Sequence, residues 1–173
     1  MDLRYPIGPF KFEGQPSQQQ IKEFISDIEQ APEHLHAALT GLSEQQLETP
    51  YRPGGWTVRQ VAHHVPESHL NAYVRMKLAL TEENPTIKPY DEARWAETAD
   101  VRNTPVSVSL TLLESLHQRW VTLLKALGPA DFARTFVHPE SGSWTLGKYL
   151  ALYAWHGKHH VAHITSLRER MGW

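Results

Sequence analysis

Apolar residues recur at helical spacing in four long stretches of this chain, and this periodicity restricts the fold more than any other feature. The stretches cover residues 18–42, 57–80, 105–127 and 145–171. Ser17 and Thr57 each stand three residues before a glutamine, which is the pattern of a capping box at a helix start. Pro105 is expected at the first position of the third helix. Because no segment predicts a pair of strands, we expect an all-α four-helix bundle.

An internal repeat refines this expectation. Residues 39–47, followed by Trp56-Thr57, resemble residues 124–132, followed by Trp144-Thr145, with an offset of 85 residues at the start and 88 at the end. Each copy contains a helix end, a short turn, a loop and a Trp-Thr helix start. We therefore predict two similar helical hairpins within a single domain over residues 1–173.

The connections and the prolines complete the predicted fold. Residues 81–104 show no clear period and predict a long crossover between the second and third helices. Pro32 and Pro66 lie within the first two helical stretches. We expect a break or a kink at Pro32 and a kink at Pro66, since proline removes one helix hydrogen bond and crowds the preceding turn.

Composition excludes several classes of protein. The chain has 173 residues, a formal charge of −2 and no cysteine, which excludes disulfides, thiolate metal sites and a cysteine nucleophile. The charge balance argues against nucleic-acid binding. No run of eighteen apolar residues is present, and residues 1–13 lack the apolar core of a signal peptide. We expect a cytoplasmic protein with no membrane partner.

Histidine is the unusual residue, with eleven copies. Seven of them form two groups: His63, His64 and His69, then His156, His159, His160 and His163. In the last helix, His156/His160 and His159/His163 are each four residues apart, so either pair can chelate one cation from adjacent turns. On a helical wheel His160 lies near the centre of the apolar face with His156 beside it, whereas His163 lies at the margin and His159 points outward. The wheel therefore favours His156 and His160.

A third metal ligand is needed, and the second helix offers it. On the wheel His69 lies nearest the apolar face, His64 lies at its edge and His63 points away, but a kink at Pro66 disturbs this geometry. Both His64 and His69 therefore remain candidates from spacing alone. His117 is a further candidate, for which the role of a histidine at the edge of the core is favoured. Three imidazoles and a water would form an open site of the catalytic type, suited to Zn, Ni, Cu or Fe(II).

A family resemblance rests on the run GWTVRQVAHH at residues 55–64 and on His156-x-x-x-His160. These motifs resemble the DinB/YfiT-like superfamily, and the match looks closest to its YfiT group. Further matching segments are Tyr5–Gly8, His117–Trp120, His138-Pro139 and Met171–Trp173.

The resemblance implies a specific site. In this family the first ligand lies eight residues after the tryptophan of the Trp-Thr helix start, which here is His64, and the others correspond to His156 and His160. It also implies one divalent metal ion per chain, for which we expect zinc or nickel, and a homodimer. Glu67, close after His64, is a possible proton-transfer carboxylate; the role of a solvated helix residue fits it at least as well.

Two chemistries compete at such a site. The superfamily that the chain resembles includes proteins described as metal-dependent hydrolases. It also includes thiol S-transferases that use bacillithiol or a similar small thiol. We predict S-transfer to a small electrophile, with bacillithiol as cosubstrate, and hydrolysis as the alternative. A metal-stabilised bundle that only binds a small molecule or a protein is the alternative from another class.

An apolar stripe supports the expected homodimer. Leu70, Val74 and Leu78 lie on one line of the second helix, away from its core face. A two-fold pairing between chains is the commonest way to cover such a stripe. The alternative is that the crossover over residues 81–104 covers it within one chain.

Overall fold

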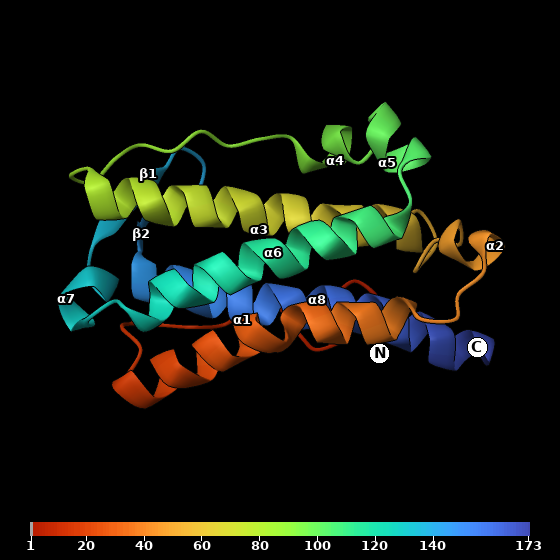
Figure 1. The fold of residues 1–173 in the computed structure, drawn as a ribbon, viewed down its shortest axis with the longest axis horizontal. Helices are drawn as coiled ribbons and strands as arrows, with labels where there is room; N and C mark the ends of the chain where they lie inside the picture. The colour runs from red at the N-terminus through yellow and green to blue at the C-terminus, as the bar shows by residue number, and fades with distance from the viewer. Residues whose placement is uncertain (1) are drawn as a thin grey trace.

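Four long helices form a bundle in the computed structural model, which describes residues 2–173 (Figure 1). They are α1 (Gln18–Leu39), α3 (Val58–Thr81), α6 (Val106–Lys125) and α8 (Leu146–Met171). Helix α1 packs against α6 and α8, and α3 packs against the same two helices. The predicted four-helix bundle is confirmed. The two helices of each repeat lie across its diagonal, so they do not pack against each other as in the expected helical hairpins. None of the described helices is both long enough and apolar enough to cross a membrane.

The connection between α3 and α6 returns along the outside of α3, so that α6 starts at the same end of the bundle as α3 (Figure 1). It contains two short helices, α4 (Glu92–Trp95) and α5 (Ala99–Asn103). The Gln60 side-chain amide donates to the Ala96 carbonyl oxygen at 3.0 Å and to the Glu97 carboxylate at 2.8 Å. The crossover is thereby attached to α3 near the Trp-Thr helix start.

The helix starts follow the predicted capping chemistry. The Ser17 and Thr57 hydroxyls accept from the backbone N–H groups of Gln20 and Gln60, and both glutamine side chains accept in return. Pro105 was expected at the first position of the third helix but is its N-cap, so α6 begins one residue later than predicted. Helix α1 continues through Pro32, so the alternative of a break there is wrong, and α3 likewise continues through Pro66.

A small antiparallel hairpin was not predicted. Strands β1 (Thr135–His138) and β2 (Gly142–Thr145) pair directly before α8, with Thr135 opposite Thr145. In the first copy of the repeat, a single bridge joins Pro50 to Thr57. These residues lie 85 and 88 positions earlier, so the longer loop of the second copy extends this bridge into a hairpin. The short helices α2 (Glu44–Leu47) and α7 (Pro129–Phe132) are likewise equivalent.

The core consists of two apolar clusters with histidines between them. The cluster near the β-hairpin includes Ile28, Met76, Trp120, Phe136 and Leu150. The cluster near α2 includes Leu35, Val61, Leu113 and Ile164. Five histidines, which we call the histidine layer, lie where these two clusters meet on α3, α6 and α8. His64 stands at the edge of the cluster near α2, and the other four lie between the clusters: His69, His117, His156 and His160. The fold thus places imidazoles in the middle of the bundle.

The close approach of α1 to α8 at this level depends on Gly157. A β-carbon at Gly157 would lie 3.3 Å from the Ala31 β-carbon and 3.7 Å from His69 Cε1. The first distance is short for two carbon atoms, so a larger residue would push α1 away from the histidine layer. The absence of a side chain therefore offsets the weak helix propensity of glycine.

Candidate metal centre

Three histidines of the layer converge on one point. His64 comes from α3, and His156 and His160 come from adjacent turns of α8. One ligand nitrogen of each lies within 4.8 Å of the others, and the Nε2 atoms of His64 and His156 are 3.3 Å apart. Among residues 2–173, no second group of three metal-ligating side chains is comparably close.

This spacing fits a bound metal ion. Imidazole nitrogens bind zinc at about 2.0–2.1 Å, and two such ligands on a tetrahedral ion are separated by roughly 3.3 Å. The separation of the His64 and His156 Nε2 atoms matches this value. No carboxylate of the described residues joins the group, so the donor set consists of three neutral nitrogens.

Burial keeps these imidazoles neutral. It lowers the pKa of His64 to about 4, with a smaller contribution from the nearby His163. Burial also lowers the pKa values of His156 and His160 well below the ordinary histidine value, and the neighbouring histidines act in the same direction. Because a charged imidazole cannot bind a metal ion, this environment favours the ligand form at neutral pH.

Aromatic and hydroxyl groups border the three histidines. The Trp56 ring lies 4.7 Å from the His64 ring, so the tryptophan of the helix start packs directly on this histidine. Ser68 Oγ lies 3.5 Å from His156 Nε2 and 3.3 Å from the Tyr153 hydroxyl. Sequence analysis did not identify Ser68 or Tyr153, although each lies about one helical turn from a clustered histidine.

His69 and His117 lie behind the cluster. The structure brings His64, and not His69, to His156 and His160. His69 contacts the opposite edge of the His156 ring, with His69 Nε2 3.1 Å from His156 Nδ1. His69 Nδ1 is 2.8 Å from His117 Nε2, and His117 Nδ1 is 2.6 Å from the Ile28 carbonyl oxygen. Both rings are buried, and burial lowers the pKa of His117 to about 4. His117 is thus a core histidine.

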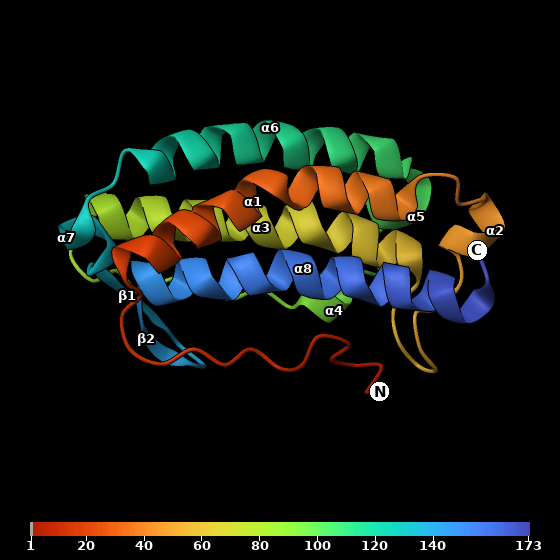
Figure 2. The same ribbon diagram turned by 90° about the horizontal axis from the view of Figure 1, so that it is seen from below.

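The predicted exposure of two other histidines is wrong. His159 and His63, expected to point outward, are both buried. His159 stacks on Trp155 at 4.3 Å, and the N-terminal segment passes alongside α8, where Tyr5 lies 5.8 Å from His159 (Figure 2). His63 lies 2.7 Å from Ser109 Oγ of α6. The helical wheel failed here because it represents one inner face, while other segments cover the outer faces.

Glu67 does not contact the cluster. Its carboxylate makes no hydrogen bond to His64, His156 or His160 among the described residues. Burial, with a contribution from the negative charge of Asp100, raises the pKa of Glu67 to about 7. Glu67 therefore titrates near neutrality without being a ligand.

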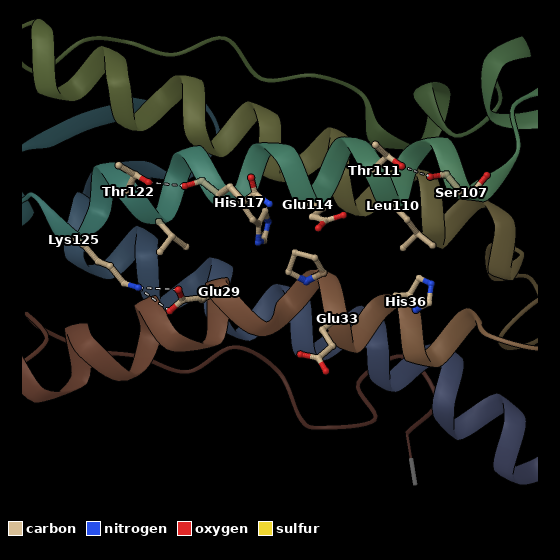
Figure 3. A pocket seen from close by; sticks show the side chains of 13 residues that line it. Glu29, Glu33, His36, Ser107, Leu110, Thr111, Glu114, His117, Thr122 and Lys125 are labelled. Carbon is tan, nitrogen blue, oxygen red and sulfur yellow. Dashed lines mark hydrogen bonds and ion pairs between the residues drawn. The ribbon is translucent and has the colours of Figure 1, made fainter.

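A separate groove of about 800 Å³ lies between α1 and α6 (Figure 3). His117 is at its inner wall, and Lys125 of α6 forms an ion pair with Glu29 of α1 at 2.8 Å. Its lining includes none of the three clustered histidines. The groove is therefore distinct from the candidate metal centre.

Comparison with known proteins places the chain in a family. A family model of the DinB superfamily matches residues 27–164. A Bacillus mycoides protein named "Putative metal-dependent hydrolase" is 58% identical over 99% of both chains. A protein of the same name from Oceanobacillus iheyensis is 56% identical over 100% of both.

Solved structures give the same result. YfiT from Bacillus subtilis, described as "a probable metal-dependent hydrolase with an unusual four-helix bundle topology", matches with a TM-score of 0.97 and 48% identity over 100% of this chain and 99% of that one. TT2238, a four-helix bundle protein, matches with a TM-score of 0.59 and 22% identity over 84% and 98%, which shows likeness of fold alone. The chain belongs to the DinB superfamily and is similar to YfiT over its whole length.

Proposed function

We propose that the chain is a metal-dependent enzyme in which His64, His156 and His160 hold one zinc or nickel ion. The convergence of three neutral imidazole nitrogens within 4.8 Å carries this proposal. The names of the similar Bacillus and Oceanobacillus proteins support metal dependence. Three protein ligands leave a coordination position for a substrate, as in catalytic rather than structural sites.

Within this class we propose thiol S-transfer. A bound divalent ion lowers the pKa of a coordinated thiol and stabilises its anion. Three neutral ligands leave the full positive charge of the ion available for this purpose, whereas a carboxylate ligand would reduce it. Since the chain has no cysteine, the thiol must come from a cosubstrate such as bacillithiol.

The chain's own groups have defined tasks in this reaction. The three histidines would hold the metal ion, which would supply the positive charge that binds the thiol as its anion. The Ser68 hydroxyl lies beside this position, between the Tyr153 hydroxyl and His156 Nε2. The sulfur forms a bond to the electrophilic carbon, the leaving group departs with its bonding electrons, and the thiol proton passes to solvent. A thiol is far more acidic than water, so no strong general base is required.

Adduct formation between bacillithiol and monochlorobimane tests the proposal. The metal-loaded protein should accelerate the reaction, and His156→Ala should lose at least tenfold of this acceleration. His159→Ala is the matched control, because it removes a buried histidine of the same helix outside the cluster, and it should retain activity. Absence of acceleration with any small thiol would contradict S-transfer.

Hydrolysis is the second candidate, and two observations favour it. The similar proteins carry the name of hydrolases. Burial raises the pKa of Glu67 to about 7, a value suited to a general base, which would have to act through a bridging water because its carboxylate makes no hydrogen bond to the three histidines. Metal-dependent turnover of ester or amide substrates without a thiol, reduced in Glu67→Gln, would favour hydrolysis over S-transfer. Turnover of neither substrate set would favour a binding protein.

We also propose that the protein is a homodimer. Leu70 and Val74 remain 41% and 47% exposed, so the crossover does not cover this part of the stripe within one chain. Pairing across α3 would remove both side chains from water. Light scattering should give a dimer mass that falls in Val74→Lys; a monomeric mass for the wild type at micromolar concentration would refute the dimer.

A further inference from the structure

Two hydrogen-bonded histidine chains approach the candidate metal centre from behind, and each ends on a backbone carbonyl. We propose that these chains fix His156 and His160 in the tautomer with the proton on Nδ1, so that both Nε2 lone pairs face the metal position. His69, His117 and His163 are then positioning residues. This inference rests on the ligand assignment of the proposed function and extends it to residues outside the cluster.

The first chain is defined from its far end. The Ile28 carbonyl oxygen can only accept, so His117 must donate to it from Nδ1, over 2.6 Å. A neutral His117 then has an acceptor at Nε2, which requires His69 to donate from Nδ1, over 2.8 Å. The His69 Nε2 atom is left as an acceptor, and His156 must donate to it from Nδ1, over 3.1 Å. The proton of His156 is thereby placed on Nδ1, away from the cluster.

The second chain follows the same rule with different atoms. The Arg4 carbonyl oxygen accepts from His163 Nε2 over 3.1 Å, so neutral His163 has its acceptor at Nδ1. His160 Nδ1 lies 3.4 Å from this atom and must be the donor. The Tyr51 ring stacks on His163 at 3.9 Å and restricts its orientation. The proton of His160 is therefore also placed on Nδ1.

These assignments depend on every intervening histidine being neutral. A doubly protonated histidine has no acceptor and would break either chain. The geometry itself requires neutral rings, because each contact between two ring nitrogens can be a hydrogen bond only if one of the two nitrogens carries no proton. The two histidine chains start on separate elements, α1 and the N-terminal segment, yet each engages Nδ1 of a clustered histidine and leaves its Nε2 without a partner in that chain.

The tautomer matters because a free histidine side chain in water favours the proton on Nε2, the atom that must bind the metal. The hydrogen bond made by one ring nitrogen decides where the proton of a neutral imidazole lies. Outer partners of metal-binding histidines therefore raise metal affinity, typically by tenfold to a hundredfold. Here the partners are other histidines and backbone carbonyls instead of a carboxylate.

Long-range ¹H–¹⁵N NMR of the metal-free, ¹⁵N-histidine-labelled protein at pH 7.5 tests the proposal directly. His156 and His160 should both give the signature of the Nδ1-protonated tautomer. Detection of the Nε2-protonated tautomer at either residue would overturn the proposal. This measurement needs no metal and no activity, so it stands even if the proposed function fails.

Substitutions in the two hydrogen-bonded histidine chains distinguish a positioning role from a structural one. His117→Phe removes the acceptor of His69 and should shift His156, but not His160, toward the Nε2-protonated form. His163→Phe should shift His160 alone. His117→Gln retains an acceptor oxygen and should restore the His156 signature. Unchanged tautomers in folded His117→Phe and His163→Phe would show that both residues are only structural.

Zinc affinity provides the second readout, by competition with a chelator. His117→Phe and His163→Phe should each weaken zinc binding by roughly tenfold to a hundredfold, and the double variant by the product of the two factors. His159→Phe is the matched control, because His159 is buried in α8 but belongs to neither of the two hydrogen-bonded histidine chains. This variant should bind zinc as the wild type does. Full zinc affinity in the double variant would overturn the proposal.

Discussion

The two apolar clusters and the histidine layer share helices α3, α6 and α8 but serve different purposes. The clusters stabilise the fold, and the layer orients imidazoles. Leu150 and Ile164, one in each cluster, are fully buried side chains whose packing contributes directly to stability. His69 is equally buried, yet its polar ring atoms are tolerated only because other imidazoles hydrogen-bond to them. The ends of the bundle therefore hold the fold, while its middle holds imidazoles in a neutral, oriented state.

Acid should affect the histidine layer far more than the apolar clusters. The pKa values of His64 and His117 are about 4 in the folded protein, below the value of about 6.5 in an unfolded chain. The unfolded state therefore binds more protons between these values, and the free energy of unfolding falls as pH falls. Each of the two should contribute a loss of roughly 3 kcal/mol from pH 6.5 to 4.

Urea denaturation of the metal-free protein at several pH values measures this loss. Glu67 acts in the opposite direction, because its folded pKa of about 7 lies above the unfolded value and its contribution is lost as pH rises. Glu67→Gln should therefore make the acid loss steeper. A free energy of unfolding that is constant from pH 7 to pH 4.5 would contradict the account of neutral, buried imidazoles.

A substitution in an apolar cluster should have the complementary effect. Leu150→Ala leaves a cavity in the apolar cluster that contains Trp120 and Phe136 and should reduce the free energy of unfolding by about 3 kcal/mol. Zinc affinity of the folded protein should remain unchanged, since Leu150 is not in the histidine layer. Denaturant unfolding and chelator competition measure the two quantities.

The control for this substitution is Leu112→Ala, because Leu112 is 44% exposed on α6 and should lose much less stability. A large loss of zinc affinity in folded Leu150→Ala would show that the apolar clusters and the histidine layer are not separable.

Sequence periodicity predicted the bundle because apolar residues face the core at helical spacing. The same argument selected His156 and His160 on α8, which the structure brings together with His64. Periodicity could not separate His64 from His69, since both are buried and the difference lies in which edge of the His156 ring each one contacts. That distinction came from the family resemblance.

The other differences arise from contacts that a single helix cannot reveal. His159 was expected to be exposed, but the N-terminal segment lies against it. The β-hairpin before α8 depends on the longer loop of the second repeat copy. Its first strand, Thr135–His138, shows too little alternation of apolar and polar residues to predict a strand. Wheel arguments therefore predict the inner face of this bundle better than its covered outer faces.

Metal content after zinc reconstitution and removal of excess ion tests the central claim most directly. Elemental analysis of the wild-type protein should give about one zinc ion per chain. His64→Ala, His156→Ala and His160→Ala should each lose most of this zinc, because two imidazoles remain in each variant. His63→Ala and His159→Ala, which remove buried histidines beside the cluster, should retain it. Equal zinc content in all five variants would contradict the assignment of His64, His156 and His160 as the metal ligands.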